Sequence, residues 1–443
     1  MGLAMKVLQS YLSALVWAMI SLTVVAQEAT DTAPMQGVPP ARDSQVTMKN
    51  YTQYPANRWA FRNAGAPLNV VMIPREGQIV SLGRPARSHL GQFKVTDLDN
   101  KQVGFDAAFA ASYADAVAVV QGNQLLHETY FGDFSPHAQH IWFSMSKSLA
   151  STAFGLLVAE GKVNLQDSPA DYIPELTGSG FERVTIQQVL DHATSIDFHE
   201  TYTNPDSDFF RYYAPALNMG WLPGSADLQP EDAEIYGVHD FLGRFIKPDP
   251  RRSPGDNFDY NSSNADVLGW LIARISGLPF QDYVQRHIWA KLGAEHDAYI
   301  AVDRAYMPAV TGGMNSTLRD ALRFGIMIKD RGMFNGQKVI PASWIDQTLK
   351  VSEQLKINMR NNSKYQADPW QAYHNMWWIL DADKGEYCAV GIHGQVIYIN
   401  RKADTVMAWF SSQPGASSAG NLDFRLKLAA ARQLAASLHN LDD

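Results

Sequence analysis

The sequence predicts a mixed α/β (α+β) protein in which an antiparallel sheet is flanked by helices and carries an inserted all-helical region. Strand-like alternation occurs towards both ends of the chain, and helical periodicity dominates between them. Hydrophobic residues make up 46% of the 443 residues and charged residues 19%, which is enough apolar material for a large core. We therefore expect one sheet assembled from segments that are distant in sequence.

The first strands and the first long helix follow each other closely. Ala116–Val120 and Leu125–Phe131 flank a polar turn with a glycine, which predicts a hairpin. Ser144–Glu160 has the composition of a helix, and Gly161 directly after it is suited to end one.

Residues 162–300 are mostly helical in pattern. Asp266–Ser276 places its apolar side chains on one face. Thr317, with Asp320 three residues later, resembles a capping box that begins a helix extending through Lys329.

The C-terminal part returns to strand periodicity. We expect a strand over Tyr387–Ile399, a turn at Asn400–Asp404, a strand over Thr405–Ser411 and a helix over Asp423–His439. The predicted organisation is a signal peptide at 1–26, a flexible leader at 27–47, an α/β domain from 48–160 and 300–443, and a helical domain at 161–299.

The N-terminus is typical of exported proteins. Lys6 precedes the apolar run Tyr11–Val25, and small side chains place the cleavage site after Ala26. We therefore expect a periplasmic or secreted protein without a stable membrane span, the alternative being an uncleaved anchor helix. The formal charge of −8 argues against a nucleic-acid partner. Cys388 is the single cysteine, so intramolecular disulfides and cysteine-built zinc sites are excluded.

The first candidate catalytic motif is Ser144-Met145-Ser146-Lys147. Positions i and i+3 of a helix share a face, so the Lys147 amine can reach the Ser144 hydroxyl. A serine becomes a good nucleophile when a neighbouring base accepts its proton, and a lysine held away from water can be that base. The alternative is a serine-rich helical turn with a solvated lysine.

Two later motifs could complete a site. Tyr260 lies on a loop before the helix at Asp266, where its hydroxyl could relay a proton. Gly391 and Gly394 flank Ile392 and His393 on the late strand, and glycines there permit a ligand to approach the backbone. A backbone N–H at this strand, opposite that of Ser144, would form an oxyanion hole. The alternatives are that the glycines only form a bulge that bends the strand, and that His393 has a purely structural role.

In this order, the three motifs resemble those of the serine hydrolases of the penicillin-recognising superfamily, which includes class C β-lactamases, D-Ala-D-Ala peptidases and related esterases. Within it, the chain is most similar to the 6-aminohexanoate-dimer hydrolase (nylon-oligomer hydrolase and carboxylesterase) branch. The stretches that carry this similarity are Asn57–Phe61, Ser144–Leu149, Ser195–Tyr202, Ala265–Leu268 and Gly391–Gln395. The resemblance implies a β-lactamase-like fold.

The resemblance also implies roles for single residues. Ser144 would be the nucleophile, Lys147 its base and Tyr260 the proton relay to the leaving group. The backbone N–H groups of Ser144 and Ile392 would form the oxyanion hole. The substrate-binding residues would be Tyr202, Ser262, Gly391, His393 and Thr311.

Three differences from the motifs of these families narrow the range of expected substrates. Ser262 replaces the asparagine of the Y-x-N motif, Ala389-Val390-Gly391 replaces K-T-G and lacks its cation, and Thr311 replaces an asparagine of the dimer-hydrolase branch. We therefore expect an exported serine hydrolase that cleaves a small-molecule amide or ester without a cofactor or metal. A homodimer is one option for its assembly. The alternatives are a β-lactamase or D-Ala-D-Ala peptidase, and a non-catalytic peptide-binding protein on the same fold.

Overall fold

The computed structural model describes residues 33–84, 90–202, 204, 206–220 and 235–439. The predicted signal peptide and the first residues of the predicted leader lie outside the described residues. The chain divides into two compact units, Met1–Gln45 and Val46–Asp443. In the described part of the first unit, a short 3₁₀ helix, η1 (Arg42–Ser44), follows a turn. All candidate site residues belong to the second unit.

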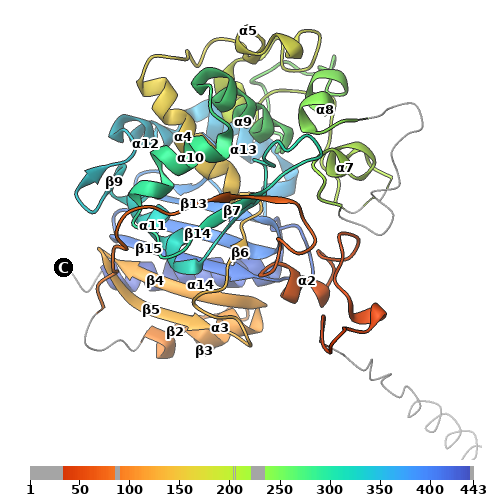
Figure 1. Cartoon of the computed structure of the whole chain (residues 1–443). Helices are drawn as coiled ribbons and strands as arrows, with labels where there is room; N and C mark the ends of the chain where they lie inside the picture. Colours follow the sequence, from red (N-terminus) through yellow and green to blue (C-terminus); the bar gives the residue numbers. More distant parts are fainter. Residues whose placement is uncertain (1–32, 85–89, 203, 205, 221–234, 440–443) are drawn as a thin grey trace, which may run out of the picture. The chain divides into compact units, whose positions relative to one another are not determined.

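The second unit contains two larger antiparallel sheets (Figure 1). One has seven strands in the order β11-β12-β13-β14-β15-β4-β5, and the other has four in the order β1-β7-β8-β6. The strands are β1 (Val70–Ile73), β2 (Lys94–Thr96), β3 (Gln102–Gly104), β4 (Ala114–Gln121), β5 (Gln124–Tyr130), β6 (His140–Ile141), β7 (Ala298–Ala301), β8 (Met314–Ser316), β9 (Met333–Phe334), β10 (Gln337–Lys338), β11 (Ala372–His374), β12 (Trp377–Asp381), β13 (Glu386–Gly391), β14 (Gln395–Asn400) and β15 (Thr405–Ser411).

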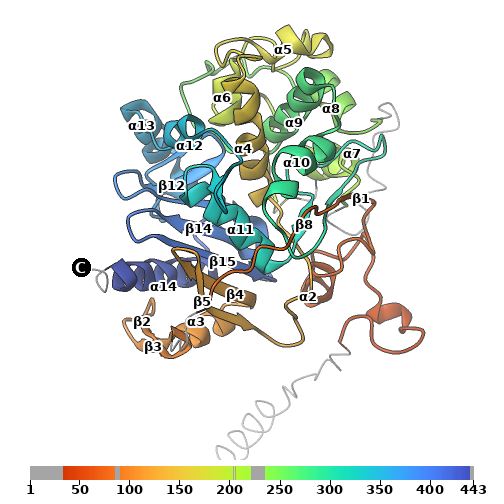
Figure 2. The same cartoon turned by 60° about the vertical axis from the view of Figure 1, so that its left-hand side comes forward.

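Helices surround these sheets, and in the described part of residues 161–297 every named element is helical (Figures 1 and 2). The α-helices are α2 (Ala56–Ala60), α3 (Phe105–Ala111), α4 (Met145–Ala159), α5 (Pro169–Tyr172), α6 (Ile186–Leu190), α7 (Ala214–Ala216), α8 (Val238–Arg244), α9 (Ser263–Ser276), α10 (Phe280–His287), α11 (Leu318–Lys329), α12 (Ala342–Thr348), α13 (Glu353–Asn361) and α14 (Leu422–His439). Shorter helical turns are η2 (Leu90–Gln92), η3 (Pro174–Leu176), η4 (Phe209–Tyr213), η6 (Trp289–Lys291), η7 (Ser363–Tyr365) and η8 (Ile392–Gly394).

The seven-stranded sheet joins the two ends of the chain, as predicted. β15 pairs with β4, so that residues 405–411 lie beside residues 114–121. The predicted hairpin is β4–β5, with a register shift between Val119 and Val120. Both faces of this sheet are covered. A side chain at Gly325 of α11 would meet Val406 of β15, whereas Trp409 of β15 packs on Phe109 of α3. Because positions three apart on a strand point to opposite faces, α11 and α3 lie on opposite sides.

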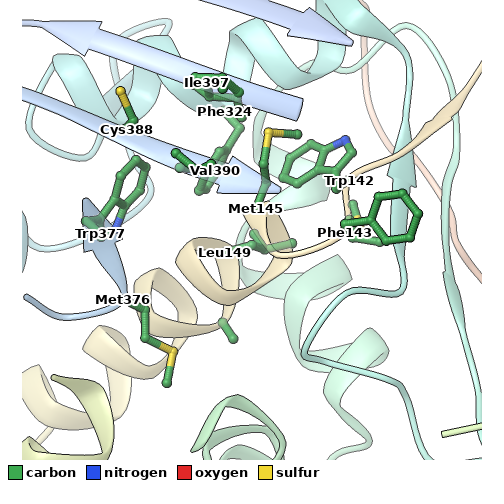
Figure 3. Close-up of a cluster of buried hydrophobic side chains, with 14 of the residues drawn as sticks. Trp142, Phe143, Met145, Leu149, Phe324, Met376, Trp377, Cys388, Val390 and Ile397 are labelled. Carbon is green, nitrogen blue, oxygen red and sulfur yellow. The ribbon is translucent and has the colours of Figure 1, made fainter. Parts of the chain in front are cut away.

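Helix α4 connects the sheet to the helical segment. Figure 3 shows Met145 and Leu149 of α4 among Trp142, Phe324 and Val390, all of them buried. Burying a side chain of this size contributes about 1.5–3 kcal/mol. On its other side α4 packs against α9, which also contacts α5, α6, α8 and α10. The helical segment is therefore part of the same compact unit as the sheet.

Most predicted elements are present, and one prediction is wrong. Helix α4 has Ser144 and Glu160 as its caps, and Gly161 follows with a φ of 68°. The predicted single strand Tyr387–Ile399 is instead two strands, β13 and β14, that pair with each other across η8. Apolar residues lie on both sides of this tight turn, so the pattern of apolar residues alone does not reveal the break.

Candidate active site

Ser144 lies directly before helix α4, at the point where the chain leaves β6. Phe143 before it has a φ of 46°, an uncommon conformation for a residue with a side chain. The Ser144 side chain does not cap the helix. Its hydroxyl is instead held by the Lys147 amine, whose Nζ lies 2.7 Å from Ser144 Oγ. The predicted contact between these two side chains is therefore present.

Lys147 has little access to water and two hydrogen-bond acceptors. The residue is 1% exposed, and its Nζ also donates to the Thr311 carbonyl oxygen at 3.0 Å. Burial lowers the pKa of Lys147 to about 8, against the opposing influence of Glu200 and Asp266. A substantial fraction of this lysine is therefore neutral near pH 8 and able to accept a proton.

Asp266 is a site residue that the sequence analysis did not identify. It lies in the first turn of α9 and is buried, and its carboxylate accepts hydrogen bonds from the Thr311 N–H at 3.0 Å and from the Tyr213 hydroxyl. Burial raises the pKa of Asp266, and the hydrogen bonds and Lys147 oppose this rise. Thr311 thus connects Lys147 through its carbonyl to Asp266 through its amide.

Tyr260 is fixed by aromatic neighbours on the loop before α9. Its ring lies 5.4 Å from Trp378, 5.7 Å from Tyr373 and 4.8 Å from His192, measured between centroids. The Lys147 Nζ is 5.1 Å from the Tyr260 ring centroid. Burial and Glu200 raise the pKa of Tyr260 above its usual range, while a hydrogen bond with Ser144 opposes this rise. Tyr260 is therefore held in its protonated form beside Ser144.

His192 orders the loop that carries Tyr260. Its Nδ1 accepts a hydrogen bond from the Asn261 N–H at 3.0 Å. Burial lowers the pKa of His192 well below its usual value, and the positive charge of Lys147 adds to this effect. The imidazole is thus neutral and acts as an acceptor that positions the residues after Tyr260.

Glu200 is the second site residue that the sequence analysis missed. It accepts hydrogen bonds from the Tyr202 hydroxyl at 2.7 Å and from the Ser262 N–H. It therefore ties two predicted substrate-binding residues together. The only sequence signal is its place inside Ser195–Tyr202, one of the stretches that carry the family resemblance.

The end of β13 comes unusually close to the chain before Ser144. A Cβ at Gly391 would lie 2.2 Å from the Trp142 carbonyl oxygen, so that only glycine fits there without displacement. Ile392 follows in η8. Gly391 thereby allows the backbone of Ile392 to approach Ser144, which is the arrangement that an oxyanion hole requires.

Two cavities meet at Ser144 and share Tyr202 and Ile392. The first, here called the Tyr260 cavity, is also lined by Tyr260, Lys364, Tyr365, Trp378, Val390, Gly391, Ser417, Ser418 and Ala419. The second, here called the Phe209 cavity, is also lined by Phe143, Phe209, Tyr213, Leu217, Met219, Ser262, Thr311 and Gly312. The structure therefore brings together all but one of the predicted site residues.

His393 is that exception. Its side chain is 2% exposed, and its ring packs against Phe61 and Phe143, at centroid distances of 5.0 and 5.7 Å. Its Nδ1 lies 2.6 Å from the Gln413 carbonyl oxygen. It lines neither of these two cavities, and its contacts are those expected of a structural histidine, so its role in substrate binding stays a prediction.

The described residues hold no candidate metal centre and no exposed thiol. Among them, no group of three or more His, Cys, Asp or Glu side chains could hold a metal ion. Cys388 is buried in the core, and burial raises the pKa of its thiol well above the usual value. Within the same residues, none of the helices combines the length and apolar character needed to cross a bilayer.

Comparison with known proteins agrees with this geometry. The family model described as Beta-lactamase matches residues 105–432, about three quarters of the chain. The chain belongs to the beta-lactamase family. It is 30% identical over 378 residues to the 6-aminohexanoate-dimer hydrolase of Paenarthrobacter ureafaciens, an alignment that covers 85% of this chain and 90% of that protein. The resemblance inferred from the motifs is thus confirmed.

Solved structures support the same family assignment and fold. A structure described as "Putative 6-aminohexanoate-dimer hydrolase from Bacillus anthracis" superposes with a TM-score of 0.77 and 26% identity, covering 90% of this chain and 99% of that one. A D-stereospecific amidohydrolase from Streptomyces sp. shares the fold, with a TM-score of 0.52 and 16% identity over 74% of this chain and 96% of that one. The chain is therefore a beta-lactamase-family hydrolase related to 6-aminohexanoate-dimer hydrolase, with the β-lactamase-like fold.

Proposed function

We propose that this protein is a serine hydrolase that cleaves an amide or ester bond through an acyl-enzyme on Ser144. The observation that carries the proposal is the contact of 2.7 Å between the buried Lys147 amine and the Ser144 hydroxyl. A lysine whose pKa is lowered to about 8 can accept the serine proton, which an ordinary solvated lysine does poorly. A protein that only binds peptides has no need of this pair.

Acylation follows from this arrangement. Neutral Lys147 accepts the Ser144 proton while Ser144 Oγ forms a bond to the substrate carbonyl carbon. The carbonyl oxygen becomes an oxyanion and accepts hydrogen bonds from the backbone N–H groups of Ser144 and Ile392. Tyr260 then donates its phenolic proton to the leaving nitrogen or oxygen as that bond breaks. The protonated Lys147 returns a proton to Tyr260, so the charges balance.

Deacylation uses the same groups in reverse. A water molecule takes the place of the leaving group, loses its proton through Tyr260 and Lys147, and attacks the acyl carbon. The second tetrahedral intermediate collapses to the carboxylic acid, and Ser144 Oγ regains its proton from Lys147. No cofactor enters either half of this scheme.

Replacement of Ser144 tests the proposal. We expect Ser144→Ala to reduce kcat for a nitrophenyl ester to the uncatalysed background. The matched control is Ser151→Ala on the same helix, because the buried Ser151 hydroxyl has no hydrogen-bond partner. Full esterase activity in Ser144→Ala would contradict the proposal. Hydrolysis of nitrocefin as fast as of esters would instead indicate the β-lactamase alternative.

We further propose that the protein is exported. The support is the sequence of residues 1–26, with its lysine, apolar run and small residues before the cleavage site. We expect the mature protein in the periplasmic or secreted fraction to begin at Gln27, which N-terminal peptide mass spectrometry measures. A cytoplasmic protein that retains residues 1–26 would contradict export.

A further inference from the structure

The Tyr260 cavity and the Phe209 cavity differ in the catalytic groups that they contain. Both contain Ser144 and Ile392, so the reacting carbonyl lies where they join. Only the first contains Tyr260. In the mechanism proposed above, on which this inference rests, Tyr260 protonates the leaving atom. The leaving group therefore occupies the Tyr260 cavity, and the acyl group occupies the Phe209 cavity.

The Phe209 cavity is apolar at the end away from Ser144. Phe209 and Tyr213 come from the π-helical turn η4, where residues four apart lie close to the same face. Leu217 and Met219 follow at the end of α7. All four are at most 2% exposed. Phe209 packs edge-on against Tyr202 and Tyr213, at centroid distances of 4.9 and 5.7 Å, which holds this wall in place.

None of the described residues that line the Phe209 cavity carries a charge. Two carboxylates accept hydrogen bonds from lining residues but do not themselves line the cavity. Asp266 accepts from Tyr213 and Thr311, and Glu200 accepts from Tyr202 and Ser262. Among the described residues, none therefore offers a charge inside the Phe209 cavity to an ammonium group at the end of the acyl chain, and loss of hydration there is strongly unfavourable.

The Phe209 cavity is also small. The cavity volume is about 20 Å³. A cavity of this size holds a group not much larger than one water molecule, so a long acyl chain does not fit inside it. We propose that the Phe209 cavity is the acyl-binding pocket and that it selects short, uncharged acyl groups over longer ones and over chains that end in an ammonium group.

The test is a series of p-nitrophenyl esters with one leaving group and different acyl groups. Acetyl, butanoyl and octanoyl vary the length, and 3-aminopropanoyl replaces the terminal methyl of butanoyl by an ammonium group of similar size. Each kcat/KM is divided by the spontaneous hydrolysis rate of the same ester. We expect butanoyl to exceed 3-aminopropanoyl by about 100-fold or more, and octanoyl by about tenfold.

A variant that enlarges the Phe209 cavity adds a second readout. Met219→Ala should raise the ratio of octanoyl to acetyl turnover by about tenfold, since each buried methylene contributes about fourfold. The control is Lys364→Ala in the Tyr260 cavity, which should leave the acyl-length ratios unchanged. The unmodified enzyme alone decides the question if Met219→Ala does not fold.

The possible outcomes distinguish an error in the pocket assignment from an error in the proposed function. Ser144-dependent hydrolysis that is indifferent to acyl length and charge would overturn the pocket assignment and leave the proposed function intact. A preference for 3-aminopropanoyl over butanoyl would do the same. Failure to hydrolyse any ester or the corresponding anilides would overturn the proposed function, and the pocket assignment with it.

Discussion

Lys147 combines near-complete burial with a position between two oxygen atoms, Ser144 Oγ and the Thr311 carbonyl oxygen. Loss of hydration favours its neutral form, and the negative charges of Glu200 and Asp266 favour its charged form. The balance places its pKa where a small change in pH alters the fraction of neutral amine. Catalysis should therefore depend on pH through this side chain.

We predict that kcat/KM rises with pH, with a midpoint near pH 8. The sign follows because the neutral amine is the base, and the amine is neutral above its pKa. Lys147→Ala should lower kcat/KM by about 10³-fold and remove this rise. A pH–rate profile of both proteins with one nitrophenyl ester measures the effect. An unchanged rise in Lys147→Ala would assign it to another group.

Tyr260→Phe should affect substrates according to their leaving group. Nitrophenolate departs without a proton, whereas an amine does not. We therefore expect kcat/KM to fall by about 10³-fold for an anilide or alkyl amide, but by much less for the nitrophenyl ester of the same acid. Equal losses for the two substrates would contradict the role of Tyr260 as the proton relay. The hydroxyl is the only group removed, so the aromatic contacts of the ring with Trp378 and Tyr373 remain.

Three elements that are distant in sequence contribute the residues of the candidate active site. Helix α4 presents Ser144 at its beginning, the loop before α9 presents Tyr260, and the end of β13 presents Ile392. Packing of α4 on α9 fixes the first two relative to each other. The third depends on Gly391, because any side chain there would collide with the backbone of Trp142.

Gly391→Ala should therefore displace the end of β13. We expect kcat/KM to fall by about 100-fold or more, as expected for loss of an oxyanion-hole donor, together with a lower Tm. Gly65→Ala is the control, since a Cβ there has its nearest neighbour at 3.7 Å. Comparable activity and Tm in Gly391→Ala and the unmodified protein would show that the close approach is not required.

The boundaries of helices and strands were predictable where neighbouring residues in the sequence determine them. The start of helix α4 at Ser144, the glycine after Glu160 and the hairpin β4–β5 each follow from neighbouring residues. The split of Tyr387–Ile399 into β13 and β14 was not predictable from the pattern of apolar residues, since apolar residues lie on both sides of η8. The glycines Gly391 and Gly394 were recognised as special, but as ligand contacts rather than as parts of a turn.

Across the whole molecule, an ionic cluster ties three segments together. Arg319 and Arg323 of α11 contact Glu128 of β5 and Glu295, which lies before β7. Arg319 Nη2 lies 2.6 Å from Glu128 Oε1, and Arg323 Nη2 lies 2.8 Å from Glu295 Oε1. Burial alone would raise the pKa of Glu128, but hydrogen bonds from Arg319 and Arg84 outweigh it and lower the pKa to about 2.

Arg323→Ala should destabilise the fold by about 3–5 kcal/mol, because Arg323 is fully buried and its removal leaves the buried Asp320 without its arginine and Glu295 with Arg319 alone. Arg331→Ala, in an exposed pair with Asp346, should change the free energy of unfolding much less. Urea unfolding measures both. Equal effects of the two changes would show that the buried cluster contributes no more than a surface pair.

The same cluster predicts the response to acid. A carboxylate whose pKa is lower in the folded state stabilises the fold above its unfolded value of 4.5, and this contribution is lost as the pH falls towards 2. We therefore expect Tm to fall between pH 4.5 and pH 2, and to fall less in Glu128→Gln. An identical acid response in the two proteins would exclude Glu128 as its source.

The part of the candidate site that lies within one short motif was predictable from the sequence. Ser144 and Lys147 are one helical turn apart, so their contact follows from spacing, and the family resemblance supplies Tyr260 and Ile392. Glu200 and Asp266 were not identified because Ser262 and Thr311 are brought to them only by the fold. Both lie in stretches that carry the family resemblance, but acidic residues are common on surfaces and no motif distinguishes these two. The structural role of His393 likewise depends on Phe61, more than 300 residues away in the sequence.

The most direct test of the central claim is mass spectrometry of the protein quenched during turnover of a slowly deacylating ester. The account predicts a mass increase equal to the acyl group, with the modification on the peptide that contains Ser144. The increase should be absent in Ser144→Ala and present in Ser151→Ala. Turnover without any acylated protein, or acylation at another residue, would contradict the acyl-enzyme on Ser144.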